Sequence, residues 1–209
     1  DYTEECTRRN RKIVRWLNEN TDVQIVIIAA AWSGHIGMLY TEEQAYNKSS
    51  SPRVLENSRE VGAQLSEFAL QKTLESIQSE NRHILLLGDM PRPNRNLNEC
   101  AFSDMTWLLR SNCSRSYEFL DAKEVNAFHK MSDKVLISVA ALNDKTDAIL
   151  PTEKLCKKEK CPTFLSGELI YRDSNHIRLN LNTATLEEIG DTLGLAQYLD
   201  SIRSHRSSA

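Results

Sequence analysis

The chain is poor in the residues that make extended or flexible proteins. Of its 209 residues only 7 are glycine and 5 are proline, and aromatic residues make up 7%. Flexible linkers and fibrous repeats are rich in glycine or proline, so neither is expected. The remaining composition, 40% hydrophobic and 26% charged, is that of an ordinary globular protein. We therefore expect a single domain over residues 1–209 with one sizeable core.

Two further shortages bear on partners and location. The chain has no excess of basic residues, because 26 Lys and Arg stand against 29 Asp and Glu for a net charge of −3. Nucleic-acid-binding proteins present a clustered basic face, so nucleic acid is not expected as a partner. The longest apolar run, residues 23–32, is interrupted by Gln24 and is about half the length of a membrane span. Residues 1–15 are charged throughout and do not resemble a signal peptide, so any targeting signal is expected outside this sequence.

Cysteine is present but sparse, with five residues. Cys156 and Cys161 enclose four polar residues, a spacing that suits a small disulfide loop in an oxidising compartment. Cys100 and Cys113 are a second candidate pair, which leaves Cys6 over. The residues alone leave two interpretations equal, namely disulfides or buried free thiols in a cytosolic protein. A zinc site would need two more nearby ligands, so no metal is expected. Glycine-rich phosphate loops are absent, so no cofactor is expected.

Apolar periodicity predicts helices and strands in alternation. Continuous apolar strands separated by helices favour a three-layer α/β/α sandwich with a mainly parallel sheet. A complete flavodoxin-like sheet has about five strands. With three clear strands here, further N-terminal strands are expected outside the sequence shown. The predicted strands cover 23–32, 83–89 and 148–150. The predicted helices cover 3–20, a short stretch from 41, 57–80, 100–109, a stretch that begins at a capping box over 121–124 and ends at about 142, and a C-terminal stretch capped at Thr185 and broken at Gly194.

The most informative short motif is Asp173-Ser-Asn-His176, which follows an apolar/polar alternation over 165–171. A carboxylate three residues before a histidine on one loop is a compact acid–base unit. The aspartate can hold one imidazole nitrogen and fix the tautomer, and the other nitrogen can then take a proton from a serine hydroxyl. The alternative is a solvated turn followed by a helix cap, because short motifs recur by chance. The catalytic interpretation predicts a contact of about 2.6–3.2 Å between the two side chains.

The flanking residues strengthen the catalytic interpretation. The stretch Gly167-Glu-Leu-Ile-Tyr-Arg-Asp173-Ser-Asn-His176-Ile resembles the last block of the SGNH hydrolase superfamily. It is most similar to the SGNH domain fused to membrane acyltransferases of family three, which O-acylate bacterial surface sugars. Ile25-Val-Ile-Ile-Ala-Ala-Ala-Trp32 and Ile84-Leu-Leu-Leu-Gly-Asp-Met-Pro91 resemble two strands of that domain. The resemblance spans nearly the whole chain and implies that Asp173 and His176 are the catalytic pair.

One block of that family is missing. The first block, a strand ending in Gly-Asp-Ser, supplies the nucleophile and is not found here. Gly88-Asp89-Met90 is no substitute, because methionine has no hydroxyl and the order fits a later strand. The resemblance therefore implies the C-terminal part of an SGNH domain with its serine outside this chain, and we expect the chain itself to lack esterase activity. Ser33 is kept as a minor alternative nucleophile.

Other candidates lie where predicted strands end, the edge at which ligands bind in open parallel sheets. Trp32 is either a pocket wall and sugar platform or a core residue. Ser33 and Gly34 are candidate backbone N–H donors to an oxyanion. Asp89 is expected to position a loop, and His129 on a predicted helix is expected to be structural.

The resemblance implies a function and a location. It implies acyl transfer, expected to be of acetyl, to a cell-surface carbohydrate, or ester hydrolysis on one. The implied partners are a carbohydrate acceptor, an acyl donor and a fused or associated membrane acyltransferase. It also favours a Cys156–Cys161 disulfide and the periplasmic side of a bacterial inner membrane. The alternative function is a non-catalytic glycan-binding or interaction domain.

Overall fold

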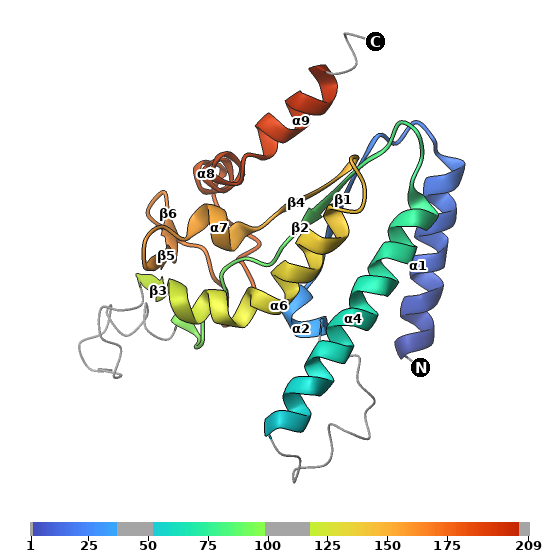
Figure 1. Ribbon diagram of the computed structural model, residues 1–209. Helices are drawn as coiled ribbons and strands as arrows, with labels where there is room; N and C mark the ends of the chain where they lie inside the picture. The colour runs from blue at the N-terminus through green and yellow to red at the C-terminus, as the bar shows by residue number, and fades with distance from the viewer. Residues whose placement is uncertain (1, 37–51, 99–117, 205–209) are drawn as a thin grey trace, which may run out of the picture. The chain divides into compact units, whose positions relative to one another are not determined.

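The computed structural model describes residues 2–36, 52–98 and 118–204 (Figure 1). The chain forms two compact units, each built from two separate stretches. The first unit is Asp1–Gly88 with Met131–Ile149, and the second is Asp89–Lys130 with Leu150–Ala209. The helices predicted near 41 and over 100–109 lie outside the described residues, as do Cys100 and Cys113.

The first unit is built on a parallel sheet of three strands in the order β1-β2-β4. The strands are β1 (Ile25–Ala29), β2 (His83–Leu87) and β4 (Thr146–Ile149). Ile25 pairs with His83, and Ile84 pairs with Thr146. The side chains of Ile84, Leu85 and Leu86 in the central strand are almost fully buried. Helices flank this sheet, so the predicted α/β class with a mainly parallel sheet is confirmed.

β1 differs from its prediction in length and in burial. It ends at Ala29, and Trp32 begins a short helix, α2 (Trp32–His35), so the predicted extension of the strand to Trp32 is wrong. β1 also pairs with β2 alone among the described strands. Because one edge of the strand has no strand beside it in this part of the chain, its side chains are not covered as a central strand's would be, and Ile27 is 49% exposed.

Two long helices belong to the first unit, α1 (Tyr2–Glu19) and α4 (Pro52–Ile77). Among the residues of α4 whose burial the structure describes, the predicted apolar face is covered only towards the end of the helix. Leu74 and Ile77 are buried, whereas Val61, Leu65 and Phe68 are at least half exposed. The reason is length. A helix of 26 residues is about 39 Å long, whereas a five-residue strand spans about 17 Å, so the sheet covers only part of the helix.

A buried arginine joins the elements of the first unit. Arg82 precedes β2 and is 1% exposed. Its Nη2 donates to the carbonyls of Leu17, at 2.7 Å, and Asn20, at 3.1 Å. Its Nε donates to Val23 O at 3.0 Å, and its Nη1 donates to Ile77 O. One cation therefore binds carbonyls at the end of α1, before β1 and at the end of α4. Its positive charge is favourable there, because the C-terminal end of a helix dipole is negative.

The second unit is made of short elements. α6 (Ala122–Ala140) begins in this unit and ends in the first, and it agrees with the predicted helix. The others are β3 (Phe119–Asp121), α7 (Pro151–Leu155), β5 (Lys160–Pro162), β6 (Phe164–Leu165), β7 (Glu168–Leu169), α8 (Thr183–Leu193) and α9 (Leu195–Ser204). β3 pairs with β5, and β6 with β7, both antiparallel.

The C-terminal helix pair corrects one predicted cap. The cap of α8 is Asn182, whose side chain accepts from the N–H of Thr185 at 2.8 Å, so the cap predicted at Thr185 is wrong. Gly194 ends α8 at φ 72°, in the left-handed region, which is the usual way a glycine terminates a helix. The break predicted at Gly194 is therefore confirmed.

Candidate functional site

A small antiparallel turn carries the predicted acid–base pair. Tyr171 and Ile177 form an isolated bridge, the N–H of Arg172 donates to His176 O at 2.8 Å, and the N–H of Arg178 donates to Ile170 O at 2.9 Å. These backbone bonds close the loop from both sides. The loop is therefore a defined turn, and the backbone positions of Asp173 and His176 are set by these hydrogen bonds.

Asp173 organises the inside of this turn. One of its oxygens, Oδ1, accepts from the backbone N–H of Asn175 at 2.7 Å and of His176 at 2.8 Å. Aspartate favours such turns because its short side chain satisfies backbone donors two and three residues ahead. The same carboxylate meets the imidazole Nδ1 of His176 at 2.9 Å through Oδ2 and at 3.0 Å through Oδ1. The predicted contact is therefore present.

Several neighbouring groups stabilise the ionised form of Asp173. The backbone N–H of Asn175 is the largest influence that holds the pKa of Asp173 well below its ordinary value. The imidazole and the N–H of His176 act in the same direction, as does Arg172, whose Nε lies 3.2 Å from Oδ2. Partial desolvation opposes them. Asp173 therefore stays ionised throughout the pH range in which a histidine titrates.

His176 is placed to act as a base. The contact with Asp173 occupies Nδ1, which fixes the proton on that nitrogen and leaves the lone pair on Nε2. The side chain is 61% exposed, and no hydrogen bond joins its Nε2 to any residue in the described part of the chain. The pair can therefore accept a proton from a hydroxyl supplied from outside the turn.

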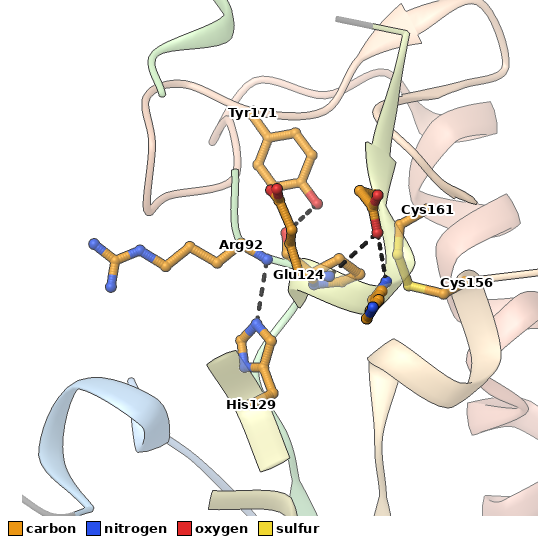
Figure 2. The surroundings of a disulfide bond; sticks show 9 residues. Arg92, Glu124, His129, Cys156, Cys161 and Tyr171 are labelled. Atoms are coloured by element: carbon orange, nitrogen blue, oxygen red, sulfur yellow. Dashed lines mark hydrogen bonds between the residues drawn. A yellow bond between two sulfur atoms is a disulfide. The ribbon is translucent and has the colours of Figure 1, made fainter. Parts of the chain in front are cut away.

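Two residues that the sequence analysis did not single out hold the turn in place. The hydroxyl of Tyr171 donates to Pro91 O at 2.5 Å (Figure 2). The side-chain amide of Asn98 donates to Arg172 O. Tyr171 is buried, and its burial raises the pKa of the phenol, so the hydroxyl remains a donor. The segment 91–98 is thus tied at both ends to the acid–base turn. The tyrosine was visible in the sequence at the end of the apolar/polar alternation; the asparagine gave no signal.

The structure describes the residues after β1 that were candidates for a pocket or an oxyanion hole. Trp32 is buried, and its Nε1 donates to Leu87 O at 2.7 Å, which agrees with the core alternative for this side chain. The N–H of Gly34 donates to Ala31 O at 3.0 Å. That donor is used inside α2, so the structure lends no support to Gly34 as an oxyanion donor. Ser33 lies in the same helical turn, and its predicted role remains untested.

A second carboxylate–histidine pair lies in the second unit. His129 of α6 is fully buried, and its Nδ1 lies 3.7 Å from Asp89 Oδ2. Its Nε2 accepts from the backbone N–H of Arg92 at 3.2 Å (Figure 2). Burial is the main cause that lowers the pKa of His129, with Asp89 opposing and Arg92 adding to the effect. The lowered pKa favours a neutral imidazole with Nε2 as the acceptor, and Asp89 lies just after β2. The structural role predicted for His129 stays a prediction.

The predicted disulfide is confirmed. Cys156 and Cys161 are bonded, with Cα atoms 4.0 Å apart (Figure 2). The bridge closes the turn before β5, which pairs with β3. Cys6 is a free, exposed thiol. In the described part of the chain, no group of side chains has the composition of a metal site, and no helix is long and apolar enough to cross a membrane.

Comparison with known protein families gives one match. The model of the family described as "SGNH domain (fused to AT3 domains)" matches residues 1–181. The matched range includes Asp173 and His176 as well as the parallel sheet. Searches of curated proteins and of solved structures found no match.

Proposed function

Because the chain belongs to the family of SGNH domains fused to AT3 domains, we propose that it takes part in O-acyl transfer to a cell-surface carbohydrate, or in ester hydrolysis on one. The observation that supports this most directly is the 2.9 Å contact between Asp173 and the Nδ1 of His176, with Nε2 exposed. That arrangement is the base half of a serine–histidine–aspartate mechanism. We assign the serine to sequence outside this chain, since no Gly-Asp-Ser occurs in it.

In this mechanism Nε2 of His176 takes the proton of the serine hydroxyl while the oxygen attacks the carbonyl carbon of an acyl ester. Asp173 stays ionised and stabilises the charged imidazole. The imidazolium then gives the proton to the departing alcohol, and an acyl-serine remains. A carbohydrate hydroxyl gives transfer, and water gives hydrolysis. In either case Nε2 removes the proton of the incoming oxygen and returns it to the serine.

We place this chemistry outside the cytoplasm, in the periplasm, beside a fused or associated membrane acyltransferase. The bond between Cys156 and Cys161 is compatible with such a compartment, because thiols in the cytosol are usually kept reduced. Membership of a family defined by its fusion to AT3 domains supports the membrane partner. The acyl group proposed is acetyl, and the acceptor is a surface glycan.

The test uses the chain preceded by its upstream sequence, and it measures hydrolysis of p-nitrophenyl acetate. His176→Ala should lower kcat by several powers of ten, as loss of a triad member does. Asp173→Asn should also lower it, because the amide no longer stabilises the charged imidazole. His35→Ala is the matched control, since His35 is an exposed histidine of α2 and should leave kcat unchanged.

Two outcomes would contradict the proposal. Equal turnover in His176→Ala and the parent would remove the enzyme and leave the alternative, a non-catalytic glycan-binding domain. Strong turnover by the 209-residue chain alone, lost in Ser33→Ala, would show that the nucleophile is Ser33 and that the serine assignment is wrong.

A further inference from the structure

The second unit contains a groove that the acid–base pair does not use. Its volume is about 720 Å³, within the range of small-molecule sites. One wall is the segment 92–97, and the other is β3 with the first two turns of α6. The lining residues that carry the argument are Arg92, Asn94, Phe119, Glu124 and Phe128.

Two flat aromatic faces stand in this groove. Phe119 is 44% exposed and Phe128 is 45% exposed, although most phenylalanine side chains are buried. Each ring has a cation nearby, with Lys160 Nζ 5.0 Å from the centroid of Phe119 and Arg92 Cζ 4.8 Å from that of Phe128. Part of the apolar surface of each ring therefore stays open beside its cation.

The polar groups beside the rings include both donors and acceptors. Asn94 donates to Glu124 Oε2 at 3.3 Å, an exposed contact that a ligand can replace. The guanidinium of Arg92 adds donors and points away from the backbone nitrogen that binds His129 (Figure 2). A hydroxyl both donates and accepts, so mixed groups over an aromatic floor suit a polyol. An acyl chain would instead need walls without charge.

We propose that this groove binds a sugar ring of the acceptor glycan, with its C–H face on Phe128 and Phe119 and its hydroxyls on the polar groups beside them. The inference rests on the function proposed above and names its acceptor site. The link between the two is the segment 91–98. Residues within 92–97 line the groove, and the two ends of the segment bond the acid–base turn, Pro91 through Tyr171 and Asn98 through Arg172 O. A sugar bound by this segment would therefore contact the same segment that positions the turn carrying His176.

The experiment is an NMR titration of the 209-residue chain with chitotetraose, maltotetraose and cellotetraose. At least one should shift the amides of 92–97 and 119–128. Phe128→Ala should weaken that binding about tenfold or more, because a stacked ring is lost, and Phe128→Trp should retain it. Phe68→Ala is the matched control: Phe68 is 59% exposed and has Lys72 5.7 Å from its ring, but it does not line the groove.

Several results would overturn the inference. They are the absence of shifts with all three sugars, shifts confined to other segments, and equal affinity in Phe128→Ala and the parent with both folded by circular dichroism. Shifts produced by octanoate and by none of the sugars would assign the groove to an acyl chain instead. The titration does not depend on turnover, so a negative titration would not contradict the role proposed for His176. Likewise, a negative hydrolysis assay would not contradict the sugar site.

Discussion

Removal of the buried guanidinium of Arg82 should destabilise the first unit more than most single substitutions do. The perturbation of choice is Arg82→Met, which keeps the length and much of the volume of the side chain. It removes all four hydrogen bonds to the carbonyls of Leu17, Asn20, Val23 and Ile77. The change therefore tests the hydrogen bonds rather than the packing.

The magnitude follows from the balance of two effects. Hydrogen bonds from a charged donor each contribute about 1.5–3 kcal/mol, and an acceptor left unsatisfied in the interior costs about 1–3 kcal/mol. Burial of the unpaired cation itself is unfavourable, and methionine relieves that cost. Asn20 O also accepts from the N–H of Val23 at 3.2 Å, so one of the carbonyls keeps a partner. The expected net loss is about 3–5 kcal/mol in the free energy of unfolding.

Urea unfolding followed by far-UV circular dichroism measures this loss, and thermal unfolding should show a fall in Tm of about 6–20 °C. Arg82→Lys should recover only part of the stability, because an ammonium group has three donors and no planar fork. Arg9→Ala is the control: Arg9 binds Glu5 at 2.5 Å, but its side chain is 72% exposed, and such surface pairs contribute about 0–1 kcal/mol. If Arg82→Met and Arg9→Ala had the same free energy of unfolding, the carbonyls would be satisfied without the arginine and the reasoning would be wrong.

Three other outcomes are expected. Replacement of Cys156 and Cys161 by serine should lower the free energy of unfolding by about 2 kcal/mol, the chain-entropy value for so short a loop, and equal stability in chemical denaturation would contradict it. Because the pKa of Asp173 is depressed in the folded chain, its ionised form stabilises the turn at pH above the unfolded pKa of about 4, and this contribution is lost only as pH falls through the lower folded pKa. The amide chemical shift of Asn175 should therefore stay constant down to about pH 4. A titration midpoint at the ordinary aspartate pKa would refute this. Asn182→Ala should cost about 1 kcal/mol through loss of the cap of α8, measured by urea unfolding, and no change would show that the cap is dispensable.

The elements that could be predicted from the sequence are those whose structure is decided by residues close together in the chain. The apolar spacing of α6 and the uninterrupted apolar run of β2 each decide their structure within a few residues. The turn at Asp173 was predictable for the same reason, since its backbone donors, carboxylate and imidazole all lie within four residues. The cap at Asn182 was missed because a capping-box pattern at Thr185 competes with it, and only the backbone geometry distinguishes the two.

Features that depend on distant residues were not predictable. The pairing of β3 with β5 brings Phe119 beside Lys160, 41 positions later in a chain that gives no sign of it. The groove exists only once the segment 92–97 lies against α6. Likewise, the exposure of Ile27 could not be read from an apolar run, because burial depends on which strands lie beside it. Periodicity indicates which face is apolar; the contacts decide whether that face is covered.

The edge of β1 that no other described strand pairs with has a practical consequence for work on this chain. The five residues of the strand are all apolar. The strand therefore lacks the charged residues and prolines that usually keep a free edge from pairing with another molecule. At the concentrations of an NMR titration, copies of the 209-residue chain are therefore expected to associate through this strand. Sedimentation velocity across that concentration range should come before any affinity is measured, and Ile27→Lys is the substitution to make if the chain self-associates.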